Sequence, residues 1–255
     1  MSKAKGKLGP KILIIDIETS PNMAHVWSLW NVNVGLNQLL ESGEVICFAA
    51  KWYGAKKTMF FSTFHDGKEQ MVLAAHDLLN EADIVVHYNG KRFDIPHLNR
   101  EFLEAGLTPP APYHQVDLFQ TSKKTFKFPS NKLDYIAQTL DIGAKTQHAG
   151  HTLWLDCLNG KSKAWKTMKE YNIHDVELTE RLYDRLLPWI HPHPNVNLYS
   201  EHPEDGCPNC GGTNLRREGT RTTDLGVYQR YQCRDCGKWS RDKLKLGGVG
   251  VRGVS

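Results

Sequence analysis

Residues 12–19 read Ile12-Leu-Ile-Ile-Asp16-Ile-Glu18-Thr19, and this stretch decides the fold. A continuous run of isoleucine and leucine is typical of a strand that is buried on both faces of a sheet. Alternate side chains of a strand share a face, so we expect Asp16 and Glu18 to project to the same side. Two neighbouring carboxylates repel each other unless a cation lies between them. The stretch therefore predicts a central strand with a candidate metal site. The alternative is a strand that ends in a polar turn, with Glu18 in solvent.

Apolar patterns on either side of this strand predict further strands and helices. Short continuous or alternating apolar runs favour strands, whereas apolar residues three or four apart favour helices. Consecutive strands come first and are followed by alternation of helix and strand, which predicts an α/β domain with a mixed sheet flanked by helices. The expected strands lie at residues 12–17, 24–30, 45–52, 58–62 and 83–87, and the expected helices at residues 69–80, 96–105, 132–140 and 163–187.

At 255 residues the chain is long enough for one large domain and an accessory module. Residues 191–194 read His-Pro-His-Pro, and proline favours extended backbone over helix, so we expect a linker there. The expected organisation is a flexible basic arm at residues 1–10, the α/β domain at residues 11–190, the linker at residues 191–203, a cysteine module at residues 204–245 and a disordered tail at residues 246–255.

Charge is distributed unevenly along the chain. Residues 201–255 contain ten Lys or Arg against seven Asp or Glu, whereas residues 1–200 contain 22 against 21. A basic excess in a small module favours contact with nucleic acid, although a tail of this charge is also common without one. The only long apolar run near the start carries Asp16 and is too short for a signal peptide or a membrane span. We therefore expect a cytoplasmic protein with no membrane partner.

Two later blocks carry further polar side chains that suit metal chemistry. The first runs from His87 to Leu98 and contains Asn89, Phe93 and Asp94, while the second places Tyr171 one helical turn before Asp175. Each block also has a plain structural explanation, with Asp94 as a helix N-cap and Tyr171 as a core residue. Carboxylates suit Mg²⁺ or Mn²⁺, and two such ions about 3.5–4 Å apart hydrolyse phosphodiesters in many enzymes.

Taken together, the three blocks resemble the DnaQ-like, or DEDD, 3′-to-5′ exonucleases of the RNase H-like superfamily. The first is similar to their Asp-x-Glu motif, and the second to the Asn-x-x-x-Phe-Asp-x-Pro motif of family B DNA polymerase proofreading domains. Tyr171-x-x-x-Asp175 resembles the tyrosine form of the third motif, which marks the DEDDy subclass. A histidine five residues before Asp175 marks the other subclass, but Glu170 stands there. The resemblance covers residues 11–190.

This resemblance implies the fold, the cofactors and a role for each site residue. It implies an RNase H-like domain with two Mg²⁺ or Mn²⁺ ions. Tyr171 is expected to orient the water that attacks the phosphodiester, and Asn89 and Phe93 are expected to shape the pocket for the terminal nucleotide. The implied metal ligands are Asp16, Glu18, Asp94 and Asp175.

Four cysteines form a second motif near the end of the chain. Two Cys-x-x-Cys pairs, 207–210 and 233–236, place four thiolates within reach of one tetrahedral ion, which predicts one structural Zn²⁺. The module resembles a zinc ribbon, with strands expected at residues 227–232 and 237–241, and its fold is expected to depend on the metal. Basic and aromatic residues around the pairs suit nucleic acid, although a purely structural or protein-binding module is the alternative. The ligands are Cys207, Cys210, Cys233 and Cys236.

The leading functional prediction is a metal-dependent 3′-to-5′ exonuclease that hydrolyses nucleic acid, with single-stranded DNA 3′ ends as the first substrate to test. A structure-selective endonuclease or an RNase is the alternative within enzymes, because the same carboxylates serve many RNase H-like proteins. A module that binds nucleic acid or protein without catalysis is the third reading. A replication or repair protein that contacts the zinc ribbon is a further expected partner.

Overall fold

The computed structural model describes residues 9–146, 150–200 and 206–251 of the protein. The chain divides into two compact units, of which one is Lys11–Leu182 and the other contains the chain from Tyr183 onward. The division falls within the last long helix, before the boundary that the sequence predicts at residue 190. Nearly all of the predicted basic arm at residues 1–10 lies outside the described residues. In the part of the chain that the structure describes, no helix has the length and apolar character to cross a membrane.

A five-stranded mixed sheet forms the centre of the first unit, which confirms the predicted fold class. Its order is β5-β4-β1-β6-β7, so β1 lies in the middle. β1 is antiparallel to β4 and parallel to β6, and these in turn pair with β5 and β7. The strands are β1 (Ile12–Thr19), β4 (Val45–Trp52), β5 (Met59–Ser62), β6 (Ile84–His87) and β7 (His114–Asp117).

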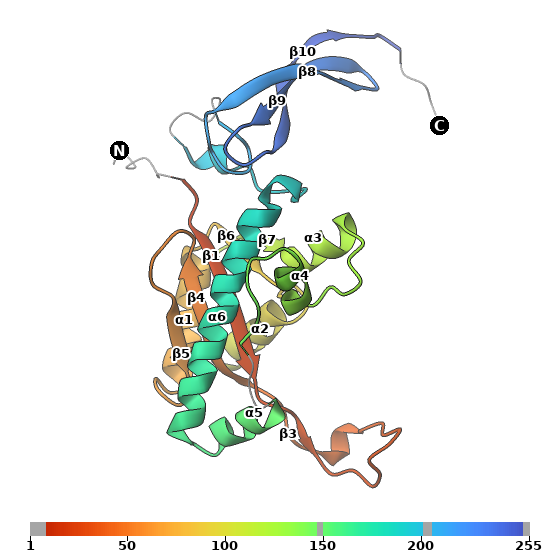
Figure 1. Ribbon diagram of the computed structural model, residues 1–255. Helices are drawn as coiled ribbons and strands as arrows, with labels where there is room; N and C mark the ends of the chain where they lie inside the picture. Colours follow the sequence, from red (N-terminus) through yellow and green to blue (C-terminus); the bar gives the residue numbers. More distant parts are fainter. Residues whose placement is uncertain (1–8, 147–149, 201–205, 252–255) are drawn as a thin grey trace, which may run out of the picture. The chain divides into compact units, whose positions relative to one another are not determined.

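Helices cover both faces of this sheet. Leu13, Ile15 and Ile17 of β1 share a hydrophobic core with α1 (Lys68–Glu81) and α2 (Asp94–Glu104). The long helix α6 (Ser162–Leu186) crosses the other face, where α5 (His151–Leu158) packs with it against β4 (Figure 1). The pleat of β1 therefore sends its odd-numbered side chains into one core and turns its even-numbered side chains toward α6. Two short helices, α3 (Leu118–Thr125) and α4 (Leu133–Thr139), complete the unit.

Between β1 and β4 the chain forms an arm with few buried side chains, seen in orange in Figure 1. Only β2 (Met23–Ala24) and β3 (Leu39–Glu41) pair there, with the 3₁₀ turn η1 (Leu36–Gln38) before β3. The strand predicted at residues 24–30 was wrong beyond Ala24, because nothing in the described structure covers its apolar side chains. Trp27 is 99% exposed and Trp30 is 82% exposed.

The second unit includes most of the segment that the sequence predicts as a linker. The Tyr183 hydroxyl lies 2.8 Å from His193 Nε2, and the Val196 amide donates to the Pro208 carbonyl over 2.9 Å. Two 3₁₀ turns, η2 (Leu187–Trp189) and η3 (Val196–Tyr199), form here, and Val196 is buried. The described part of the predicted linker is therefore packed structure, because the prolines are followed by a residue, Asn195, whose side chain caps η3.

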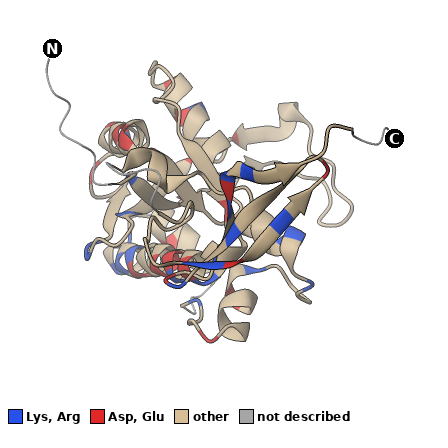
Figure 2. Cartoon of the chain, turned by 90° about the horizontal axis from the view of Figure 1, so that it is seen from above, with Lys and Arg blue, Asp and Glu red and all other residues tan. Residues whose placement is uncertain are grey.

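A three-stranded antiparallel sheet in the order β10-β9-β8 forms the rest of this unit. The strands are β8 (Leu215–Thr223), β9 (Gly226–Cys233) and β10 (Trp239–Gly248), and Lys or Arg occurs on all three (Figure 2). The sequence pattern missed β8, whose side chains are mostly exposed and lack apolar alternation. The tail predicted as disordered from residue 246 begins inside β10, since Gly247 and Gly248 pair with β9. Residues 252–255 lie outside the described residues.

We expect Phe48→Ala to lower the free energy of unfolding by about 3–5 kcal/mol, because it removes a large side chain from the core beneath α1. Phe48 is fully buried in β4 and stacks on Phe61 at 5.2 Å between ring centroids. Urea unfolding followed by circular dichroism measures the change. Phe48→Leu is the control and is expected to cost about 1 kcal/mol. Equal stability of Phe48→Ala and the parent protein would contradict this packing.

Candidate metal centres

Three carboxylates from β1 and α6 meet on the α6 face of the sheet. Ligand oxygens of Asp16, Glu18 and Asp175 all lie within 4.8 Å of one another. Asp16 and Glu18 share this face because they are two residues apart in a strand, as the sequence predicts. Asp175 reaches them from α6, where it is buried and one turn after Tyr171. The structure thus brings together side chains from opposite ends of the domain.

Asn172 connects α6 directly to β1, a role that was not predicted from the sequence. Its side-chain amide donates to Asp16 Oδ2 over 2.8 Å and to the Asp16 carbonyl over 3.2 Å. Asn172 is fully buried and precedes Asp175 by three residues, so it shares the face of α6 that looks at the strand. The three-residue spacing from Asp175 was the one feature of the sequence that could have indicated Asn172 as a site residue. The two bonds fix the position of the Asp16 carboxylate relative to the helix.

Asp94 approaches the same strand from α2. It is the first residue of this helix, and its Oδ1 accepts a hydrogen bond of 3.0 Å from the Ile17 amide, between Asp16 and Glu18. The alternative role as an N-cap does not hold, because Phe93 occupies that position without a capping side chain. Asp94 lies outside the group of three carboxylates but close enough to raise the pKa of Asp16. Asp94 therefore lies at the border of the cluster and is not one of the three carboxylates whose oxygens lie within 4.8 Å of one another.

Loss of hydration dominates the electrostatics of the cluster. Burial, followed by repulsion from Asp94 and Glu18, raises the pKa of Asp16 well above its usual value. Burial and then Asp175 raise the pKa of Glu18 to about 8, and burial raises the pKa of Asp94 to about 7. Each shift means that the ionised form is unfavourable as the protein stands without a bound cation.

Among the described residues, one positive side chain, that of Lys145, lies in this cluster, and its role was likewise not predicted. Its ammonium group forms an ion pair with Asp175 Oδ2 and donates to the Tyr171 hydroxyl over 3.2 Å. Burial alone lowers the pKa of a lysine, but attraction to Asp175 and then to Asp16 leaves that of Lys145 above its usual value. Nothing in the sequence marks this lysine, because it comes from the irregular segment after α4.

The residues present fit a divalent cation. All ligand atoms of the group are carboxylate oxygens, which suit hard ions such as Mg²⁺ and Mn²⁺. Among the described residues a single lysine faces Asp16, Glu18, Asp94 and Asp175, so positive charge is in deficit when all four are ionised. In addition, the buried Oδ1 of Asp175 has no hydrogen-bond partner among the described residues. This orphaned oxygen is the strongest local indication of an ion site.

Asn89 and Phe93 lie in the loop that leads into α2. Asn89 has a positive φ of 66°, and its backbone amide donates to Asp117 Oδ1 over 3.1 Å. The next residue must be glycine, because a Cβ on Gly90 would lie 2.5 Å from Cγ of His87. The Phe93 ring is 41% exposed. The loop is therefore fixed by its backbone and presents an aromatic ring next to Asp94, while the expected contacts of Asn89 and Phe93 with a nucleotide stay predictions.

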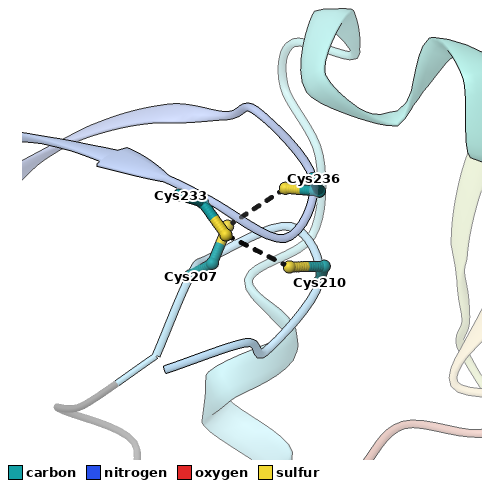
Figure 3. Close-up of side chains that lie close together, drawn as sticks. All are labelled: Cys207, Cys210, Cys233 and Cys236. Carbon is teal, nitrogen blue, oxygen red and sulfur yellow. Dashed lines mark hydrogen bonds between the residues drawn. The ribbon is translucent and has the colours of Figure 1, made fainter. Parts of the chain in front are cut away.

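The four cysteines of the second unit form a separate cluster (Figure 3). The sulfur atoms of Cys207 and Cys236 are 3.6 Å apart, and those of Cys210 and Cys233 are 3.7 Å apart. A tetrahedral ion with metal–sulfur bonds of about 2.3 Å requires sulfur–sulfur distances of about 3.8 Å. All four cysteines are free thiols, and their sulfur atoms lie within 4.8 Å of one another. The geometry therefore fits one ion held by four thiolates.

Comparison with known families supports the fold of the first unit. The sequence model RNase_H_2, of the RNase H superfamily, matches residues 35–187, which is more than half of the chain. The chain belongs to the RNase H superfamily. The match includes Asp94, Tyr171 and Asp175 and begins after Asp16 and Glu18. It confirms the expected RNase H-like fold, while the DEDDy subclass stays a prediction.

One solved structure similar to this member of the RNase H superfamily is the family B DNA polymerase from the hyperthermophilic archaeon Pyrobaculum calidifontis. The TM-score is 0.54 at 17% sequence identity, and the similarity covers 85% of this chain and 31% of that chain. At such low identity the similarity shows the fold alone. No curated protein matches the sequence.

We expect Asp16→Asn to raise the Tm of the RNase H unit by roughly 2–4 °C in the absence of added divalent ions, because it removes about 1 kcal/mol of repulsion. A carboxylate whose folded pKa is raised destabilises the fold as pH rises from its usual pKa, 3.8 for Asp16, toward its raised value. The gain from the substitution is therefore larger at pH 8 than at pH 5.

The same thermal measurement tests ion binding. Added Mn²⁺ should raise the Tm of the parent protein and have little effect on Asp16→Asn, since a bound ion stabilises only the state that holds it. A lower Tm for the variant without metal, together with an unchanged response to Mn²⁺, would show that Asp16 is structural.

Proposed function

We propose that this chain is a metal-dependent 3′-to-5′ exonuclease, with the 3′ end of single-stranded DNA as its leading substrate. The observation that carries the proposal is the meeting of Asp16, Glu18 and Asp175 beside Lys145 and Tyr171, within a fold of the RNase H superfamily. The DEDDy pattern of the sequence supports action at an end. The exposed ring of Phe93 beside Asp94 supports it further, because an aromatic ring stacks on a terminal base.

Two divalent ions supply, when bound, the activation of water and the stabilisation of the leaving oxygen. Asp16 is the residue proposed to serve both ions, because, in addition to burial, Asp94, Glu18 and Asp175 all act on it and raise the pKa of its carboxyl group. Glu18 and Asp175 are proposed to complete the first site, and Asp94 to support the second. Asn172 keeps the Asp16 carboxylate in one orientation through its two hydrogen bonds.

The remaining polar groups act on the water and the phosphate. Burial, and then Asp175, raises the pKa of the Tyr171 phenol, so it remains a neutral hydrogen-bonding group throughout the physiological range. A neutral phenol at this position orients a water molecule without removing its proton. The Lys145 ammonium, 3.2 Å from the Tyr171 hydroxyl, offsets the negative charge that builds on a reacting phosphate.

The carboxylates also argue against a binding module without catalysis. Burial raises the pKa values of Asp16, Glu18 and Asp94, so these groups weaken the fold at neutral pH unless cations bind. A scaffold gains nothing from this arrangement. An endonuclease or an RNase uses the same carboxylate chemistry, and the assay below separates these activities from an exonuclease.

For the cysteine cluster we propose one structural Zn²⁺. Four thiolates leave no open coordination position, so the ion stabilises the fold and takes no part in hydrolysis. The Gly212 amide, 3.4 Å from the sulfur of Cys210, further stabilises a thiolate. The module thus corresponds to a zinc ribbon whose fold depends on the ion.

Digestion of a 5′-labelled single-stranded DNA with Mg²⁺ or Mn²⁺ is expected to give a ladder that shortens from the 3′ end. Asp175→Asn should lower the rate at least about 10³-fold, because it removes an ion ligand, and Tyr171→Phe about 10²-fold, because it removes an orienting hydroxyl. Glu170→Gln is the matched control on α6, where its side chain is exposed, and should cleave at the parent rate.

Circular single-stranded DNA and a labelled RNA complete this assay. Cleavage of the circular DNA would identify an endonuclease instead of an exonuclease, and cleavage of RNA alone would identify an RNase. No cleavage of any substrate with either ion, by protein that shows the Mn²⁺ stabilisation described above, would contradict a nuclease.

Elemental analysis of the purified protein is expected to find one zinc per chain, and Cys236→Ser is expected to lose it. The variant should then be cut by protease within β8–β10, because the small sheet depends on its ion. Cys157→Ala is the control, since Cys157 lies in the other unit, and should keep its zinc. A zinc-free parent protein that resists protease would contradict the structural role.

A further inference from the structure

The three-stranded sheet of the second unit carries a pocket of about 510 Å³ on one of its faces. Arg230 of β9 lies directly opposite Arg241 of β10, and Trp239 precedes Arg241 by two residues. Arg221 of β8 lies opposite Tyr228, which precedes Arg230 by two residues. Alternation therefore places these five side chains on the same face. The pocket is lined by His191, Arg221, Arg230, Trp239, Ser240 and Arg241.

The pocket concentrates positive charge that is not neutralised by the described part of the protein. No carboxylate lines it, and no ion pair of Arg221, Arg230 or Arg241 occurs among the described residues. Glu218, the nearest acidic residue along β8, pairs with Arg216 and Arg234 instead. Two arginines directly opposite each other are unfavourable in a sheet. An anionic ligand removes this repulsion.

The aromatic rings of this face indicate which kind of anion fits. The Arg230 guanidinium lies 4.6 Å from the centre of the Trp239 ring, and that of Arg241 lies 3.8 Å from the centre of the Tyr228 ring. Trp239 remains 47% exposed. Flat guanidinium groups and an exposed indole side by side suit a ligand that has both phosphates and planar rings.

We infer that this arginine pocket binds single-stranded nucleic acid, with a phosphate held by the arginines and a base stacked on Trp239. A duplex keeps its bases stacked inside the helix and offers only phosphates. An acidic peptide offers charge and no base. The inference goes beyond the proposed hydrolysis, since it assigns a separate binding site to the zinc-dependent unit and does not require the nuclease proposal to be correct.

Fluorescence anisotropy with a 5′-labelled oligo-dT of fifteen nucleotides tests the site in the full chain carrying its zinc. The measurement uses the Asp16→Asn protein without added Mg²⁺ or Mn²⁺, so that the oligonucleotide is not digested. The binding result is then independent of whether the protein is a nuclease. Trp239→Ala should weaken binding about 10-fold, the usual effect of losing one base stack, while Trp239→Phe should retain most of the affinity.

Arg241→Gln should weaken binding and also reduce the dependence of the affinity on salt by about one phosphate contact. The matched control is Arg217→Gln, which removes the same charge from β8. Arg217 pairs with Tyr231 and therefore lies on the opposite face, so this variant should change the affinity less than 2-fold. Zinc content verifies that each variant is folded.

Three results would overturn the inference. The first is an equal loss of affinity in Arg217→Gln and Arg241→Gln, which would mean that binding depends on the total charge of the sheet and not on the arginine pocket. The second is unchanged binding in both Trp239→Ala and Arg241→Gln. The third is equal competition by a DNA duplex or by poly-glutamate, which would identify a site for anions without recognition of bases.

Discussion

The alternation of side chains along β1 is the constraint on which the rest of the domain depends. Leu13, Ile15 and Ile17 anchor the core beneath α1 and α2, and this fixes Asp16 and Glu18 on the opposite face. A slip of one residue in the pairing of this strand exchanges the two sets and destroys both the core and the carboxylate cluster. Because β1 pairs with β4 on one side and β6 on the other, its register is fixed twice.

The sequence predicted best where one strong local pattern decided the structure. The isoleucine-rich strand, the long helix that carries Asp175 and the cysteine pairs are of this kind, because pleat, helical period and metal spacing each act over a few residues. Lys145 and Asn172 were missed for the opposite reason. Each acquires its role only when distant elements meet, and neither type of residue is unusual where it occurs in the sequence.

Other differences arose where tertiary surroundings overrode local tendency. Val26 and Trp27 favour a strand, but the arm offers them no partner. The His-Pro-His-Pro segment suggests a linker, yet the residues after it pack into the second unit through Val196 and Asn197. β8 was missed because its strand is specified by pairing with β9 rather than by buried side chains of its own.

The two clusters differ in how much of the chain must exist before they form. Two of the cysteine sulfurs in contact are 29 residues apart, whereas Asn172 meets Asp16 across 156 residues. During synthesis on the ribosome the chain emerges from its N-terminus, so β1 is made long before α6, which completes the carboxylate cluster. An unfinished or truncated chain that ends before α6 holds Asp16 and Glu18 but no closed cluster. Whatever chemistry the carboxylates perform is thereby withheld until the domain is complete.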